Sequence, residues 1–214
     1  MPQKSKPESV PSPGDTRDRL TDRKRAAIVQ AAVEAFHTYG YYAASMDGIA
    51  KRASVSKRTL YNHFSSKEAL FDAIVEELFT RVEQLPACEF DSTREIREQL
   101  TELAHTEVNF FISEDVQALA RAGLSRVLAE PEVGRQVDHR RLLRRVEIWF
   151  QEAQAAGVLI DADAETAALQ FIGLLRTFAF WPMIVHGEAP PNERERKAIV
   201  TSTVEMFLSR YAAR

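Results

Sequence analysis

Apolar side chains recur every three to four residues over most of the chain, which is the spacing of helices that bury one face. The first such helix spans about residues 22–39 and ends at Gly40. A later one follows a capping pattern, Ser65 with Glu68, and ends before Pro86. No useful stretch alternates polar and apolar residues and no segment repeats, so the sequence predicts an all-α protein.

The chain after residue 90 is also predicted to be helical, with breaks at Pro131, Gly157 and Pro182. Leu128 and Met206 are assigned to the buried faces of their helices. The expected segments are residues 96–110, 116–128, 132–156, 164–181 and 193–212. Together with the N-terminal segments, they give about nine helices.

Two short helices are expected between residues 45 and 64. Ser45 can cap the first, residues 53–55 form a tight turn, and Ser56 can cap the second. Two short helices joined by such a turn describe a helix-turn-helix, whose second helix can enter the major groove of DNA.

The second of these helices has only two large apolar side chains, Leu60 and Phe64, four residues apart and therefore on one face. The remaining positions are expected to point outward and are Lys57, Arg58, Thr59, Tyr61, Asn62 and His63. A helix that contributes so little to a core indicates a function for its surface.

Charge is distributed unevenly, although the formal net charge is only −3. Residues 1–70 contain 12 Lys and Arg against 7 Asp and Glu, whereas residues 71–214 contain 16 against 24. A net +5 on the N-terminal part suits contact with phosphate, but an ordinary solvated surface would have the same composition.

Residues 26–77 resemble the DNA-binding domain of the TetR/AcrR family of bacterial transcriptional regulators. The resemblance includes the Ser45 cap, the turn, the residues 59–64 and Lys67 at the start of a fourth helix. The family usually has Gly at the turn position of Ser54, where serine can adopt a left-handed backbone at a modest cost.

Residues 118–181 are similar to the C-terminal domain of an AcrR-like subgroup. The two resemblances imply a three-helix helix-turn-helix domain followed by a helical domain for ligand binding and dimerisation. From the composition we expect a disordered tail at 1–20. The resemblances imply the DNA-binding domain at 21–85 and the effector-binding and dimerisation domain at 90–214.

Four residues at the start of the second short helix are candidates for reading bases. Arg58 can pair bidentately with guanine, and Lys57 can do the same or bind phosphate. Asn62 can read adenine or contact the DNA backbone, and the methyl group of Thr59 can pack on thymine.

Four further residues are assigned to the phosphate backbone. The family resemblance implies that Tyr61 and His63 bind phosphate. Lys67 and Ser45 lie at helix N-termini, which favour anions. Each of three residues can instead have no contact with DNA. Tyr61 can be partly buried, His63 can be an ordinary histidine at a helix end, and Lys67 can be an ordinary surface lysine.

The resemblance implies a small-molecule effector between helices of the C-terminal domain. The aromatic candidates for the wall are Phe110, Trp149, Phe150 and Phe171, and the polar candidates are His105, Asn109 and Arg176. Aromatic residues at helical spacing are also typical of a core. Arg176 can instead form an ion pair or extend toward solvent at a helix edge.

The resemblance also implies a homodimer formed through the last two long helices, which carry Phe178, Trp181, Met206 and Phe207. We therefore expect a repressor that binds a palindromic double-stranded DNA operator and is released by a small apolar or aromatic ligand. The alternative is a DNA-binding protein whose C-terminal domain binds another protein.

Other functions find no support in the sequence. The single cysteine, Cys88, excludes an intramolecular disulfide and a thiolate metal site, and the five His are scattered. No phosphate-binding glycine loop or nucleophile elbow is present, so we expect no catalytic residues, metal or cofactor. No secretory signal is found, and the most apolar run, 171–185, is too short to cross a bilayer, so we expect a cytoplasmic protein without membrane contact.

Overall fold

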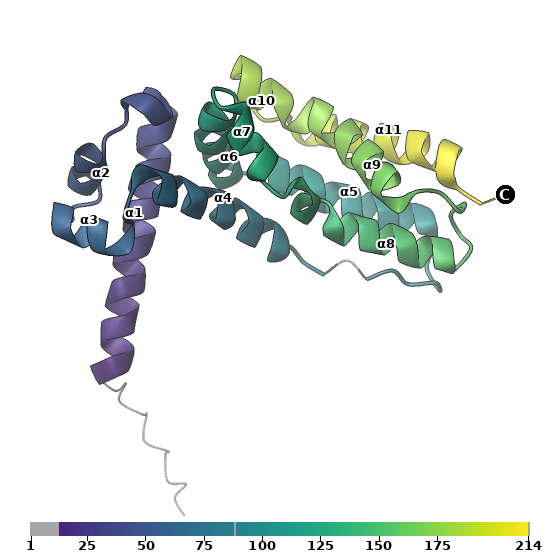
Figure 1. Ribbon diagram of the computed structural model, residues 1–214. Coiled ribbons are helices and arrows are strands. Elements are labelled where there is room, and N and C mark those ends of the chain that lie inside the picture. Colours follow the sequence, from purple (N-terminus) through teal and green to yellow (C-terminus); the bar gives the residue numbers. More distant parts are fainter. Residues whose placement is uncertain (1–12, 88, 214) are drawn as a thin grey trace, which may run out of the picture. The chain divides into compact units, whose positions relative to one another are not determined.

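The computed structural model describes residues 13–87 and 89–213. These residues form eleven α-helices and one short 3-10 helix, with a single isolated bridge between Leu159 and Ala212 (Figure 1). The expected all-α class is confirmed. The chain divides into two compact units, Met1–Phe71 and Asp72–Arg214.

The N-terminal unit consists of α1 (Pro13–Ala43), α2 (Met46–Arg52), α3 (Lys57–His63) and the start of α4 (Lys67–Glu83). Its core forms where the apolar faces of these helices meet. The most deeply buried side chains include Ile28, Ala32, Phe36, Ile49, Leu60 and Leu70. The burial of Leu60 on α3 fixes which face of that helix points outward.

Helix α1 begins earlier than the sequence suggests. Residues 1–12 of the expected tail lie outside the described residues, but residues 13–20 are helical rather than disordered. Pro13 is favourable as the first helical residue because the N–H that it lacks would have no helical partner. No Gly or Pro interrupts the chain from Asp15 to Tyr39. Gly40 then breaks the helix, as expected, with φ 76° and ψ 161°.

The C-terminal unit contains the rest of α4 and all later helices. These are α5 (Ile96–Ile112), α6 (Glu114–Val127), α7 (Pro131–Gln136), η1 (His139–Leu142), α8 (Arg144–Ala155), α9 (Ala164–Ala179), α10 (Trp181–His186) and α11 (Glu193–Tyr211). Aromatic rings from α8, α9 and α11 occupy its core. Phe150 stacks on Phe207 with 4.7 Å between ring centres, and Phe171 meets Phe150 edge-on at 5.6 Å.

The long helix predicted over residues 132–156 is wrong. Val137 is extended (φ −78°, ψ 123°), and the carboxylate of Asp138 accepts the backbone N–H of Arg140, which starts a new turn. The predicted inward positions of Leu128 and Met206 are also wrong, because these side chains are 78% and 55% exposed. Leu128 is the C-cap residue that follows the last turn of α6.

The division between the units falls inside α4, whereas the sequence suggested residues 85–90 as the boundary. The later turns of α4 are tied to the C-terminal unit by ion pairs. Arg141 contacts both Glu76 and Glu83 at 2.7 Å, and Arg81 contacts Asp115 at 2.8 Å. A linker composition alone does not reveal such contacts.

Helices α9 and α10 form one apolar stretch, Ala164–His186, that is long enough to cross a membrane by length and composition. The sequence-based estimate of 171–185 was too short because the apolar helix begins at Ala164. Phe171, Leu175 and Ala179 of this stretch are buried in the core. Core helices commonly meet the same criterion, so length and composition do not identify a membrane span here.

Candidate functional site

Two serine caps position the helix-turn-helix. The hydroxyl of Ser45 accepts the Gly48 N–H at 3.1 Å, and that of Ser56 accepts the Thr59 N–H at 3.0 Å. Both caps were predicted from the sequence. Each satisfies a backbone donor that the first turn of a helix leaves without a helical partner.

The turn between α2 and α3 relies on Ser54, whose φ is 55°. The N–H of Val55 donates to the Ala50 carbonyl at 3.0 Å, and the N–H of Ser54 donates to the Lys51 carbonyl at 3.2 Å. This pair of bonds ends α2 in a Schellman motif. Serine thus adopts the left-handed conformation that glycine would adopt without strain.

Helix α3 docks through Leu60 and Phe64, which are almost completely buried, as predicted. The guanidinium carbon of Arg25 lies 5.2 Å from the centre of the Phe64 ring and covers it. The opposite side of α3 is exposed at Lys57, Arg58, Tyr61 and Asn62. α3 therefore presents a polar, basic surface on a fixed base.

The exposed side chains of α3 differ in how free they are to bind DNA. Lys57 pairs with Asp47 of α2, and the Thr59 hydroxyl hydrogen-bonds Ser56 at 2.9 Å. Such an exposed ion pair is worth at most about 1 kcal/mol, so phosphate can replace Asp47 as the partner of Lys57. Arg58 has no ion pair or side-chain hydrogen bond among the described residues. Tyr61 is 50% exposed, whereas His63 is half-buried beside Phe64.

Lys67 occupies a different environment from the phosphate site that we expected. Its ammonium group donates to the carbonyls of Tyr41, Tyr42 and Ala44 at 2.9, 3.2 and 3.1 Å and lies 4.6 Å from the centre of the Tyr41 ring. Its three N–H groups are therefore used to close the end of α1. This geometry favours a role in stabilising the unit.

Replacing Lys67 with methionine is expected to lower the free energy of unfolding of the N-terminal unit by about 1–3 kcal/mol, because three carbonyl groups lose their donor. Thermal unfolding of the full chain measures this loss, with the exposed Lys51→Met as a control. DNA affinity should fall without a change in its salt dependence. A slope of log affinity against log salt that decreases by about one would instead identify a phosphate contact.

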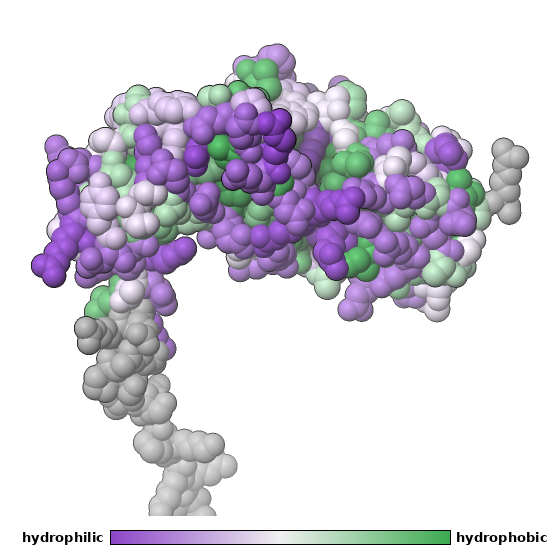
Figure 2. All heavy atoms as spheres, in the orientation of Figure 1, coloured by the Kyte–Doolittle hydropathy of each residue, from purple (hydrophilic) through white to green (hydrophobic). Residues whose placement is uncertain are grey.

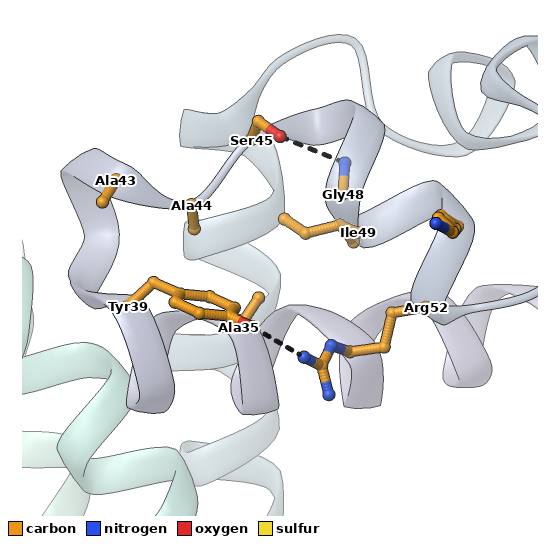
Figure 3. A pocket seen from close by; sticks show the side chains of 9 residues that line it. Ala35, Tyr39, Ala43, Ala44, Ser45, Gly48, Ile49 and Arg52 are labelled. Carbon is orange, nitrogen blue, oxygen red and sulfur yellow. Dashed lines mark hydrogen bonds between the residues drawn. The ribbon is translucent and has the colours of Figure 1, made fainter.

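A hollow of about 620 Å³ lies between α1 and α2 (Figure 3). Small residues, Ala35, Ala44 and Gly48, form part of its wall. At its edge, Arg52 pairs with Glu34 of α1 at 3.1 Å. The sequence did not point to this hollow, because it depends on how α1 and α2 cross.

The C-terminal unit contains a cavity of about 350 Å³ whose wall is almost entirely apolar. Its apolar lining comes from α4, α5, α6, the 137–143 segment, α9 and α10 and consists of Val75, Leu78, Phe79, Phe110, Phe111, Val116, Leu119, Ala120, Gly123, Leu124, Val127, Val137, Leu142, Leu143, Leu169, Phe180 and Trp181. Two polar side chains complete it, His139 and Arg176. A cavity of this size and lining is typical of small-molecule sites.

Of the seven residues expected around a ligand, Phe110 and Arg176 line this cavity. Trp149, Phe150 and Phe171 are fully buried in the neighbouring core instead. Asn109 is exposed and His105 is partly exposed, and neither lines the cavity.

Helix α6 contributes much of the wall but was not singled out from the sequence. The sequence feature that could have pointed to α6 is Gly123, because glycine is destabilising in the middle of an amphipathic helix. A Cβ atom at Gly123 would meet no atom within 4 Å. This residue therefore leaves open space next to the apolar face of α6.

A buried carboxylate and two partly buried guanidinium groups interact next to the cavity. Glu107 is only 3% exposed and pairs with Arg145, which also donates to the Pro86 carbonyl at 2.8 Å. Burial raises the pKa of Glu107, and the positive charge of Arg145 opposes this change. Burial lowers the pKa of Arg176, and Glu107 opposes that change. An arginine nevertheless keeps its charge at neutral pH.

Apolar side chains are exposed on α9, α10 and α11, the helices expected to form the dimer. They are Leu169, Phe178, Trp181, Val185 and Met206, between 43% and 65% exposed. Hydrophilic residues cover most of the face shown in Figure 2, and one apolar patch at its top lies over α10. Phe207, also expected on this face, is buried in the core.

Two family models match the chain. Residues 28–74 match the bacterial regulatory proteins of the tetR family, and residues 98–213 match the C-terminal domain of AefR-like transcriptional repressors. Among curated proteins, the HTH-type transcriptional activator FasR of Mycolicibacterium smegmatis is 38% identical over 137 residues, which are 61% of this chain and 60% of FasR. The chain thus spans less than two thirds of this relative's length.

Solved structures are similar over nearly their whole length. A TetR family transcriptional regulator from Pseudomonas syringae pv. tomato has a TM-score of 0.81 at 37% identity, covering 90% of this chain and 99% of its own. The flavonoid-responsive regulator FrrA has a TM-score of 0.71 at 31% identity, with the same coverage. These relatives are transcription regulators rather than enzymes. The serine-capped helix-turn-helix and the helical C-terminal unit therefore belong to a member of the TetR family of bacterial transcriptional regulators.

Proposed function

We propose that this protein is a cytoplasmic homodimeric repressor that binds a palindromic operator and is released by a small apolar or aromatic ligand. The observation that carries the ligand response is the apolar cavity of about 350 Å³ in the C-terminal unit. The match to AefR-like repressors supports repression, although FasR is an activator. FrrA, which is flavonoid-responsive, supports a small-molecule effector.

The exposed surface of α3 supports the assignment of DNA contacts. Arg58 and Asn62 are proposed to read bases, since their side chains are exposed near the start and middle of the helix. Tyr61, His63 and Lys57 are proposed to hold phosphate and fix the register of α3 in the groove. Ser45 can donate its hydroxyl proton to phosphate while it accepts the Gly48 N–H.

Helix α4 supports coupling between ligand and DNA. It begins in the N-terminal unit, and its later residues Val75, Leu78 and Phe79 line the cavity. A ligand that prefers one position of these residues shifts the equilibrium of the helix that follows α3. Because binding free energies are reciprocal, operator and ligand must weaken each other by the same factor.

The exposed apolar residues of α9, α10 and α11 are proposed to form the dimer interface. Phe178→Asp should convert dimers to monomers, because a charge would be buried in an apolar contact. Analytical ultracentrifugation at micromolar concentration measures this change. Leu128→Asp is the matched control, since Leu128 is 78% exposed outside this surface. A dimer that withstands Phe178→Asp but not Leu128→Asp would move the interface elsewhere.

The two tryptophans should report differently on a bound effector. Trp181 lines the cavity, whereas Trp149 is fully buried in the core. An effector should change the tryptophan fluorescence and release operator DNA over one concentration range. Trp181→Phe should remove most of the signal, and Trp149→Phe should retain it. Operator release only by another protein, with unchanged fluorescence, would support the alternative in which the C-terminal unit binds a protein.

A further inference from the structure

The wall of the C-terminal cavity includes one formal charge among the residues that the structure describes, the guanidinium of Arg176. The guanidinium carbon lies 5.2 Å from the centre of the Phe111 ring. This cation–π contact supplies no oxygen acceptor for the five N–H groups. Within the described ranges, Arg176 has no ion pair or hydrogen bond from its side chain.

The charges next to the cavity do not balance. Glu107 is the carboxylate that acts on Arg176, but Glu107 is already paired directly with Arg145. Glu107 thus interacts with two guanidinium groups, and among the described residues Arg176 is the one of the two without a direct carboxylate partner. An uncompensated charge in an apolar environment is costly, so an anion that enters the cavity gains strongly from pairing with it.

We infer that the effector is a small organic acid, with one carboxylate that binds Arg176 and an apolar body that fills the rest of the cavity. This inference rests on the proposed function of the cavity as the effector site and adds the chemical class of the ligand. A carboxylate matches the guanidinium fork, which can donate two parallel hydrogen bonds to it.

The dimensions and lining of the cavity restrict this class further. A volume of about 350 Å³ is near the lower end for ligand sites, which favours a short chain or one to two rings. The other polar group in the wall is His139, and the remaining wall is apolar. A second charge on the ligand would lack a partner there, so diacids are expected to bind more weakly than monoacids.

The test compares acids with neutral compounds of nearly the same shape. The probes are 2-naphthoate with 2-naphthamide and decanoate with decanamide, titrated into the full chain by calorimetry at neutral pH. We expect at least one acid to bind at least tenfold more tightly than its amide. Arg176→Gln should remove this preference and Arg176→Lys should retain part of it. Arg97→Gln, which removes an exposed arginine of α5 outside the cavity wall, should leave it intact. Circular dichroism and thermal unfolding verify that each variant is folded.

The outcomes separate this inference from the proposed function. Equal or tighter binding of both amides to the parent protein, or an unchanged acid preference in folded Arg176→Gln, would overturn the acid assignment and leave the cavity as an effector site. Failure of all four probes to bind would count against the cavity itself, and with it against both proposals.

Discussion

Replacing Phe150 with alanine is expected to lower the free energy of unfolding by about 3–5 kcal/mol. Phe150 is fully buried and contacts the rings of Phe207, Phe171 and Trp149 at centre distances of 4.7, 5.6 and 5.5 Å. Its removal leaves a void between three rigid rings from different helices, which cannot close without moving the helices. Urea unfolding followed by tryptophan fluorescence measures the loss.

The control for Phe150→Ala is Leu128→Ala, which removes an exposed side chain and should change stability by less than about 0.5 kcal/mol. The sequence alone suggested that Phe150 lines the ligand pocket. If Phe150→Ala weakened ligand binding but left stability within the range of the control, that earlier assignment would be right and the core position would be contradicted.

The double variant Arg58→Ala with Tyr61→Ala should lose specific DNA binding while remaining folded and dimeric. Each direct contact is worth about 1–3 kcal/mol, so the combined loss approaches abolition of binding at physiological salt. Both side chains are exposed and neither contributes to the core of the N-terminal unit. Fluorescence anisotropy with labelled operator DNA measures affinity, and ultracentrifugation measures the dimer.

The control for the double variant removes one positive charge from the C-terminal unit. Lys197 on α11 is an exposed basic residue of the C-terminal unit, and Lys197→Ala should leave operator affinity nearly unchanged. An equal loss of operator affinity in the Lys197→Ala protein and in the double variant would indicate a general effect of positive charge. Unchanged affinity in the double variant would exclude α3 as the recognition helix.

The features that the sequence predicted well depend on local interactions. The caps at Ser45 and Ser56 are hydrogen bonds to backbone groups three residues ahead, and the hydrogen bonds of the turn at Ser54 join residues no more than five positions apart. Leu60 and Phe64 are buried because they share one face of a short helix. Such relations follow from spacing and residue type without knowledge of the tertiary structure.

The contacts of Lys67 could not be predicted because its partners are the carbonyls of Tyr41, Tyr42 and Ala44, 23 to 26 residues earlier in the chain. A lysine at a helix N-terminus suggests an anion when only its own helix is considered. The approach of the end of α1 to the start of α4 provides three carbonyl acceptors within the protein.

The ligand cavity was only partly predictable for a related reason. Periodicity identifies the apolar face of a helix, but it does not show whether that face meets a neighbouring helix or an empty space. Trp149 and Trp181 have the same side chain and lie on helices. The structure places the first in a packed core and the second in the cavity wall.

The most direct test of operator recognition through α3 is the selection of binding sites by the purified protein from a random duplex library. We expect enrichment of an inverted repeat whose half-sites lie about one helical turn, or a multiple of it, apart and that binds an even number of chains. The Arg58→Ala, Tyr61→Ala protein should enrich no sequence. Absence of any enriched repeat, or enrichment of the same repeat by the double variant, would contradict operator recognition through α3.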